Sequence, residues 1–203
     1  MKKTILITGA SSGIGRETAK FFQKKGWNVV ATMRNPETET ELTGLKNVFV
    51  TKLDVLDLDS IQQAITYGIE KFERIDVVIN NAGYGIGGSI EELSDVETRN
   101  SFDVNVFGSL NVIRKALPYL RAQKNGHIFN ISSIGGFSGG FPAFGIYCAT
   151  KFAVHGFTES LYHEAKPFGI NVSLVMPGYF RTSFLEGGSI VKPKNEIEAY
   201  QNV

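Results

Sequence analysis

Residues 147–151 (YCATK) carry a phenol and an amine four positions apart, in a segment of small and apolar residues. On a helix, side chains at i and i+4 lie one turn apart on the same face. An ammonium beside a phenol stabilises the phenolate, and a phenol with its ordinary pKa of ~10 needs such help to exchange protons at neutral pH. Tyr147 and Lys151 are therefore a candidate acid/base pair. The pentapeptide alone favours a plainer interpretation, a core-edge Tyr147 and a solvated Lys151 on an amphipathic helix, so the rest of the chain must decide.

A glycine-rich turn, residues 8–15 (TGASSGIG), stands between the first predicted strand and the first predicted helix. Glycines allow a tight turn and the close approach of a phosphate to the main chain, and the helix that follows offers free N–H groups. The spacing of Gly9, Gly13 and Gly15 differs from G-x-G-x-x-G. Its position after a strand and before a helix nevertheless favours a nucleotide-binding turn.

Residues 9–13 also match G-x-S-x-G, the nucleophile turn of α/β hydrolases, which would make Ser11 a nucleophile. That turn follows a central strand preceded by other strands, whereas only eight residues precede Gly9. A base is needed as well, and His127, His155 and His163 fall within a predicted strand or helix, where we interpret them as structural. The hydrolase hypothesis is therefore set aside.

The second predicted strand ends in Met33 and Arg34, where a dinucleotide fold that prefers NAD carries an acidic residue. A guanidinium pairs well with the oxygens of a 2′-phosphate. Arg34 therefore favours NADP as the cofactor, with NAD less favoured. The alternative is that Arg34 is a solvated surface residue at the start of a loop.

The elements that must position these groups alternate along the chain. Short apolar runs predict strands at 4–8, 28–32, 48–52, 77–80, 127–131 and 171–175. Helical periodicity predicts helices at 14–25, 58–72, 96–123 and 147–168. Such alternation indicates an α/β fold with a doubly wound parallel sheet, Rossmann-like and covered on both faces. The chain, 1–203, is expected to form a single domain, and the irregular loop 132–147 to leave the carboxyl edge of the sheet, where ligands bind.

Composition limits the other classes of function. The chain of 203 residues is 42% hydrophobic and 20% charged with a net charge of +1, which is ordinary for a globular protein and predicts no nucleic-acid partner. The one cysteine, Cys148, suits a reducing compartment. No apolar run is long enough for a signal peptide core or a membrane span. We expect a cytoplasmic protein without a metal site.

Taken together, these fragments resemble the short-chain dehydrogenase/reductase family, and the resemblance covers nearly the whole chain. The matching segments, in order, are residues 8–15, LDV at 53–55, NNAG at 80–83, NVFG at 105–108, NISS at 130–133, YCATK at 147–151 and MPGYFRT at 176–182. Each fragment is common alone. Seven in the family's order make chance implausible.

The resemblance implies an oxidoreductase that transfers a hydride between NADP(H) and a carbonyl or secondary alcohol. It implies that Tyr147 is the acid/base, that Lys151 lowers its pKa and holds the ribose, that Ser133 donates a hydrogen bond to the substrate oxygen, and that Asn105 holds a water linking Lys151 to solvent. The cofactor-binding residues it implies are Gly9, Ser11, Ser12, Gly13, Ile14, Gly15, Arg34, Asp54, Val55, Asn81, Ala82, Gly83, Tyr147, Lys151, Pro177, Gly178 and Thr182.

Two departures from the family's pattern matter. Ser133 and Tyr147 are one residue further apart than usual, with Gly139-Gly140 as the expected insertion, and Ser132 is a less favoured alternative because it should point to the other face of its strand. The sequence also ends soon after the expected substrate loop at about 183–200, so we expect the usual last strand to be missing. An unpaired sheet edge and a partly open pocket would follow. The alternative function is a catalytically impaired cofactor-binding or scaffold protein of the same fold.

Aromatic side chains gather near the expected pocket and favour a bulky, hydrophobic small-molecule substrate. They are Phe137, Phe141, Phe144, Tyr179, Phe180 and Phe184. The competing interpretation is that half of them pack in the core or cover the sheet edge. By family likeness the helices at 96–123 and 147–168 would form the interface of a homodimer or homotetramer.

Overall fold

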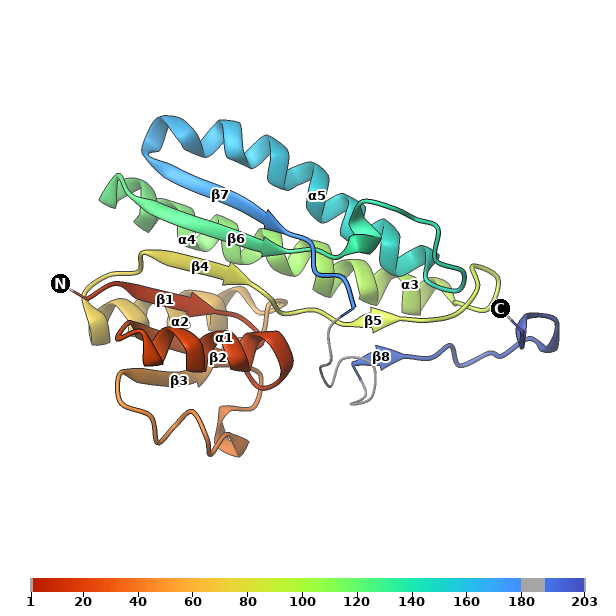
Figure 1. Cartoon of the computed structure of the whole chain (residues 1–203), viewed down its shortest axis with the longest axis horizontal. Coiled ribbons are helices and arrows are strands. Elements are labelled where there is room, and N and C mark those ends of the chain that lie inside the picture. The colour runs from red at the N-terminus through yellow and green to blue at the C-terminus, as the bar shows by residue number, and fades with distance from the viewer. Residues whose placement is uncertain (1, 180–188, 203) are drawn as a thin grey trace.

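The structure, a computed structural model, describes residues 2–179 and 189–202. Its main sheet has six parallel strands in the order β3-β2-β1-β4-β6-β7 (Figure 1). These are β1 Thr4–Ile7, β2 Asn28–Met33, β3 Val48–Lys52, β4 Val77–Asn80, β6 Gly126–Ile131 and β7 Ile170–Val175. The predicted strands are confirmed, and the chain forms the predicted Rossmann-like domain.

The strands at the middle of the sheet are short and apolar because they are buried on both faces. Every residue of β1 and of β4 is buried. In β1, Ile5 is in register with Val29 of β2 on one side and Val77 of β4 on the other. A parallel strand with two such neighbours needs no alternation of polar residues.

Two layers of helices cover the sheet. Helix α1, Gly13–Lys24, packs through Ala19 on the face that carries Ile5 and Ile7. The other face carries Leu6 and packs against α2 Leu58–Phe72, α4 Ser109–Gln123 and α5 Gly145–Ala165. Short 3₁₀ turns complete the connections: η1 Pro36–Thr38, η3 Ile134–Gly136, η4 Lys166–Phe168 and η5 Glu198–Tyr200.

The face that carries α1 is less completely covered toward the β7 edge of the sheet. Residues alternate between buried and half-exposed along β6, and the outward positions of β7 are Asn171, Ser173 and Val175. The predicted helices on both faces are confirmed, but the α1 side is less completely covered at these two strands, where Phe129 and Ile131 of β6 still pack against the cluster of Ile5, Ile7 and Ala19. Within residues 2–179 and 189–202 no seventh strand joins the main sheet.

The predicted continuous helix at 96–123 is interrupted. It consists of α3 Asp95–Phe102, a π-helical turn η2 Asp103–Gly108, and α4. The side chain of Asn105 in η2 bonds the main chain of Tyr84, with its Oδ1 accepting from Tyr84 N at 3.0 Å and its Nδ2 donating to Tyr84 O at 2.9 Å. The wide turn aims Asn105 at that partner, and π-turns of this kind are frequent at functional sites.

A small second sheet lies beyond the carboxyl ends of the main strands (Figure 1). It pairs β5 Gly85–Ile86 in parallel with β8 Ile190–Val191. Of the predicted substrate loop at about 183–200, residues 183–188 lie outside the described part, and residues 189–200 contain β8 and η5. No helix among the described residues has both the length and the apolar character that a membrane span requires.

Candidate functional site

One cavity of about 510 Å³ lies at the carboxyl ends of the main-sheet strands. In doubly wound sheets this edge is where ligands bind. The predicted site residues that line it are Gly9, Ser11, Ser12, Gly13, Ile14, Arg34, Asp54, Val55, Asn81, Ala82, Gly83, Ser133, Tyr147, Lys151, Pro177 and Gly178. Gly15 and Asn105 are described residues that lie outside its wall, and Thr182 lies outside the described residues. A single hollow therefore joins the glycine turn to the Tyr147–Lys151 pair.

The glycine turn is tightly packed at Gly9 and Gly15 and open at Gly13. Gly9 has φ +65°, and a Cβ added there would lie 2.9 Å from Ala82 Cα. A Cβ on Gly15 would overlap the carbonyl oxygen of Gly9. Gly13, with φ +52°, has open space where a side chain would stand. Gly9 and Gly15 are thus required for packing, and Gly13 leaves room for a phosphate to reach the main chain.

The amino terminus of α1 has unused hydrogen-bond donors. Ser12 is the residue before the helix, its side chain makes no capping bond, and the first turn contains no acidic residue. Ser11 and Ser12 are both exposed. Free N–H groups and the positive end of the helix dipole favour an anion here.

Thr8 fixes the turn to the end of β4, a role that the sequence analysis missed. The amide N–H groups of Asn81 and Ala82 each donate to Thr8 Oγ1 at 3.0 Å. Asn81 Nδ2 donates in return to Thr8 O at 2.9 Å and to Gly9 O at 3.0 Å. These four bonds hold the two strand ends in one geometry, so the wall of the cavity is formed before any ligand binds.

Arg34 is the available cation at the end of β2. It is exposed, lines the cavity and makes no hydrogen bond or ion pair with any residue in the described ranges. Arg16 of α1, by contrast, is held by Glu39 at 2.7 Å and by Glu41 at 3.2 Å. A phosphate at this end of the cavity would therefore meet a guanidinium that no described residue engages.

The neighbouring wall comes from the residues after β3. Asp54 Oδ1 accepts from Leu56 N at 3.0 Å, which turns the chain toward α2. Val55 is buried, and a Cβ on Gly108 would lie 2.6 Å from Val55 Cγ2. Gly108 thus allows Val55 to lie against the π-helical turn in the wall of the cavity.

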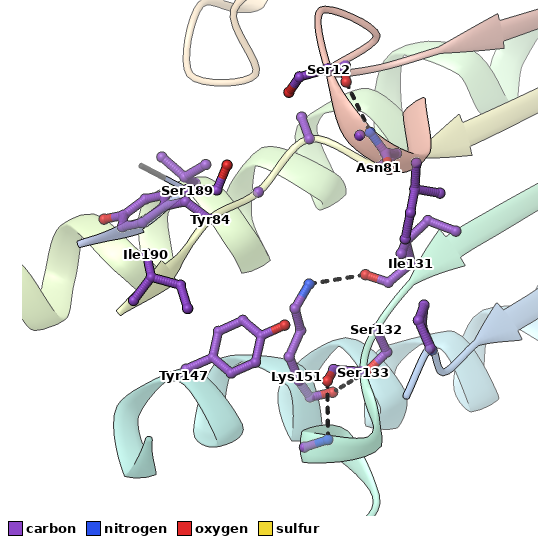
Figure 2. Close-up of a pocket in the computed structure, with 18 of the residues that line it drawn as sticks. Ser12, Asn81, Tyr84, Ile131, Ser132, Ser133, Tyr147, Lys151, Ser189 and Ile190 are labelled. Atoms are coloured by element: carbon purple, nitrogen blue, oxygen red, sulfur yellow. Dashed lines mark hydrogen bonds between the residues drawn. The ribbon is translucent and has the colours of Figure 1, made fainter. Parts of the chain in front are cut away.

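The two serines after β6 face opposite ways, as the strand pleat predicts. Ser132 Oγ donates to Lys151 O at 3.0 Å and is buried against α5. Ser133 lines the cavity, and its Oγ accepts from Gly135 N at 3.1 Å (Figure 2). The hydroxyl of Ser133 is also hydrogen-bonded with Tyr147, so both side chains meet at one point of the cavity. Gly139 and Gly140, the expected insertion, are exposed in the loop that follows.

Lys151 is 7% exposed and extends from α5 into the cavity (Figure 2). Its Nζ donates to Ile131 O at 3.0 Å and lies 5.6 Å from the centre of the Tyr147 ring. Burial lowers the pKa of Lys151 to about 8. The solvated Lys151 of the plainer interpretation is therefore wrong.

Tyr147 is half-buried beside Lys151, with its hydroxyl in the cavity (Figure 2). Burial raises the pKa of Tyr147, and a hydrogen bond with Ser133 opposes that rise. The expected lowering by Lys151 is thus not observed, because desolvation dominates. The geometry brings the phenol, the hydroxyl and the amine together as predicted.

Asn105 is 1% exposed, and its side chain is engaged by protein atoms. Besides Tyr84, its Nδ2 donates to Thr150 Oγ1 at 3.2 Å. Thr150 precedes Lys151 on α5, so Asn105 joins that helix to the segment after β4. The water that this residue was expected to hold stays a prediction.

A buried row of polar side chains supports the same wall and was not found from the sequence. Asn80 Nδ2 donates to Asn130 Oδ1 at 2.8 Å, and Asn130 Nδ2 donates to Thr158 Oγ1 at 2.9 Å. The row joins β4, β6 and α5 below the cavity. The two asparagines begin the segments NNAG at 80–83 and NISS at 130–133. Neither segment by itself indicates that the two side chains meet.

The aromatic side chains divide between two places. Phe141, Phe144 and Tyr179 line the cavity, whereas Phe137 is 71% exposed and does not. Phe180 and Phe184 lie outside the described residues. The described part of the chain contains no group of three or more His, Cys, Asp or Glu side chains placed to bind a metal ion.

Comparison with known proteins agrees with this geometry. The family model described as short chain dehydrogenase matches residues 3–189. The 3-ketodihydrosphingosine reductase of Bacteroides thetaiotaomicron is 43% identical over 196 residues, covering 97% of this chain and 71% of that protein.

Two solved structures show the same fold with a nucleotide. ElxO with NADP bound superposes with a TM-score of 0.86 at 34% identity, covering 92% of this chain and 77% of the other. A short chain dehydrogenase/reductase from Burkholderia phymatum in complex with NAD superposes with a TM-score of 0.83 at 30% identity, covering 99% and 72%. The family model matches nearly the whole chain, and the fold carries the predicted site. The protein therefore belongs to the short-chain dehydrogenase family.

Proposed function

We propose that this protein transfers a hydride between NADP(H) and a bulky, apolar ketone or secondary alcohol. The observation that carries the proposal is the single cavity that runs from the open glycine turn to Ser133, Tyr147 and Lys151. A dinucleotide needs an anion site at one end and a reaction centre at the other. The turn at Gly13 and the uncapped α1 supply the first, and the three polar side chains supply the second.

The residues of the chain divide the work at the substrate oxygen. NADPH, when bound, supplies the hydride. Tyr147 gives a proton to the oxygen as the alcohol forms and takes it back in the reverse direction. Ser133 donates its hydroxyl proton to the same oxygen, where negative charge develops. Lys151 holds the ribose hydroxyls and, with an oxidised nicotinamide nearby, stabilises the phenolate that burial alone disfavours.

The preference for NADP rests on Arg34. Its guanidinium has no partner among the described residues and lies in the cavity wall at the end of β2. The similar structures hold NADP in one case and NAD in another, so likeness alone does not decide. A free cation where an acidic residue would favour NAD supports NADP.

The Arg34→Ala variant should lose this preference. Because a charge-assisted contact to a phosphate disappears, we expect the KM for NADPH to rise by about 30-fold and the KM for NADH to change by less than about twofold. Initial rates with each cofactor measure both values. Arg114→Ala on the exposed side of α4 removes an equal charge away from the cavity and serves as the control. An unchanged NADPH/NADH ratio in Arg34→Ala would remove the argument for NADP.

The substrate class follows from the far wall of the cavity. Tyr84, Phe141, Phe144 and Ile190 line it, and such apolar lining suits a bulky hydrophobic carbonyl. The relative named 3-ketodihydrosphingosine reductase supports a ketone. The test is oxidation of NADPH with a panel of ketones and aldehydes of increasing apolar size, expected to be fastest with bulky ketones. No turnover with any of them would contradict the proposal.

The alternative is a cofactor-binding or scaffold protein that keeps the fold without turnover. A protein that only binds a nucleotide has no use for a buried lysine beside a phenol that is hydrogen-bonded with a serine hydroxyl. We therefore favour the enzyme. A cytoplasmic location and a homodimer or homotetramer stay predictions.

A further inference from the structure

The segment 189–202 forms one wall of the cavity and then runs along the start of α3. Ser189 and Ile190 line the cavity, and Ile190 lies across from Tyr147 (Figure 2). The pairing of β8 with β5 spans two residues of each strand and includes bonds from Gly85 N to Ser189 O at 2.8 Å and from Gly87 N to Val191 O at 2.9 Å. A pairing this short is marginal by itself. Other contacts must hold the segment.

The position of Ile190 affects the reaction centre directly. A Cβ on Gly87 would lie 3.6 Å from Ile190 Cγ2 and 3.8 Å from Phe144 Cζ, so these two side chains converge on one point. The Phe144 ring meets the Tyr147 ring edge-on, with 6.4 Å between centres. A shift of the segment would therefore change the space beside Tyr147 that a bulky substrate must occupy.

Two nearly buried glutamates bind the main chain of this segment. Glu97 Oε1 accepts from Lys194 N at 3.0 Å, and Glu92 Oε1 accepts from Ile197 N at 3.0 Å. Each glutamate is 9% exposed. Hydrogen bonds to an ionised carboxylate are among the stronger ones in proteins.

The other oxygen of each glutamate has a separate task. Glu97 Oε2 accepts from Ser94 N at 3.0 Å and from the Ser94 hydroxyl, which caps α3. Glu92 Oε2 accepts from Ser89 N at 2.8 Å in the preceding turn. The bonds to Ser94 chiefly lower the pKa of Glu97, and the bond from Ile197 N chiefly lowers that of Glu92. A local cap needs only one oxygen, so in both residues the second is left for the segment 189–202.

We propose that Glu92 and Glu97 are positioning residues, which hold the segment 189–202 so that Ile190 forms the substrate wall opposite Tyr147. Their bonds reach backbone N–H groups, so they fix the path of the main chain whatever side chains stand at 194 and 197. That the glutamates hold the segment does not depend on the proposed function, whereas the effect on substrate binding rests on it. Substrates large enough to reach Ile190 depend on the two glutamates, and small carbonyls do not.

Hydrogen exchange tests the structural part without any turnover. Glu92→Met and Glu97→Met remove both oxygens but keep an apolar side chain of similar length. We expect exchange at the amides of Lys194 and Ile197 to quicken by at least about tenfold, because these amides lose their acceptors. Ser94→Ala and Ser89→Ala are the matched controls, since each removes a capping hydroxyl and leaves the bond to the segment. Glu97→Gln keeps one neutral acceptor, so its exchange rate at Lys194 should lie between those of wild type and Glu97→Met.

Kinetics tests the consequence with this same chain. For a bulky ketone we expect the two methionine variants to raise KM by about tenfold with kcat and the Kd of NADPH within about twofold of wild type, and the KM of a small ketone to stay unchanged. Ile190→Ala should reproduce this pattern. If Glu97 served only to cap α3, Ser94→Ala and Glu97→Met would lower the Tm by similar amounts, and neither would change a KM.

Two results would overturn the proposal: unchanged exchange at both amides, or faster exchange with KM values equal to those of the serine controls. If wild type turns over no carbonyl, the proposed function has failed, and the exchange measurement alone decides whether the glutamates hold the segment.

Discussion

Replacing Tyr147 with Phe is expected to lower kcat for ketone reduction by about 10³-fold while NADPH binds as in wild type. The substitution removes one oxygen from a side chain whose ring already packs against Phe144. It therefore leaves the shape of the cavity and takes away the group that exchanges a proton with the substrate oxygen. Steady-state assays of ketone reduction measure kcat, and fluorescence titration measures the Kd of NADPH.

The control for this variant is Tyr162→Phe, which deletes the same atom from the same helix at a residue that is 41% exposed and outside the cavity wall. It should retain wild-type rates. If Tyr147→Phe reduced bulky ketones as fast as Tyr162→Phe does, another group would be the proton donor, and Ser133 would be the first to examine. Loss of NADPH binding in Tyr147→Phe would instead show that the hydroxyl holds the cofactor.

The sequence predicted the main sheet because its signals are local. Runs such as Ile5–Ile7 in β1 are apolar, and the helices between the strands carry their own periodicity. The position of the cavity followed, since parallel strands bring their carboxyl ends to one edge. Ser133 could be preferred over Ser132 for the same reason: neighbouring residues of a strand face opposite ways.

The second sheet and the break at η2 could not be predicted, because their causes lie far apart in the chain. Gly85–Ile86 is too short to show any period, and it becomes a strand only by pairing with Ile190–Val191. The π-turn exists where Asn105 reaches the main chain of Tyr84. Nothing in the residues around 105 announces that partner.

The direction of the pKa shift of Tyr147 is another property that the sequence spacing did not predict. The i,i+4 spacing correctly placed Lys151 beside Tyr147, and the Coulomb argument then predicted a lowered phenol pKa. Burial reverses that sign in the structure. The degree of desolvation depends on every element around α5, so it is known only once the fold is known.

Replacing Lys151 with Met is expected to abolish most activity and yet stabilise the protein at pH 7. Burial lowers the pKa of Lys151 from an ordinary 10.5 to about 8, so below pH 8 the folded protein holds a charge that the interior disfavours. The substitution removes that cost but leaves Ile131 O without its donor, for a net gain on the order of 2 kcal/mol. In a domain of this size that is a rise in Tm of about 5 °C. We expect kcat to fall by about 10²-fold or more, because the phenolate loses its nearby cation.

The pH dependence of stability separates this cause from better packing. Between about pH 8 and pH 10.5 the unfolded wild-type chain binds more protons at Lys151 than the folded one, so wild-type stability gains from this residue as the pH rises through that window. Lys151→Met lacks that gain, so its advantage should be largest below pH 8, reach zero at about pH 9.5 and change sign by pH 10.5, where only the lost bond to Ile131 O remains. Lys71→Met, which removes an exposed charge from α2, should follow the wild-type curve.

Two other outcomes would contradict this account of Lys151. An advantage of Lys151→Met that persists unchanged to pH 10.5 would mean that the new side chain merely packs better than the lysine. A variant less stable than wild type at pH 7 would mean that the bond to Ile131 O outweighs the cost of the buried charge. Only the expected curve identifies Lys151 as a residue kept for chemistry at the expense of the fold.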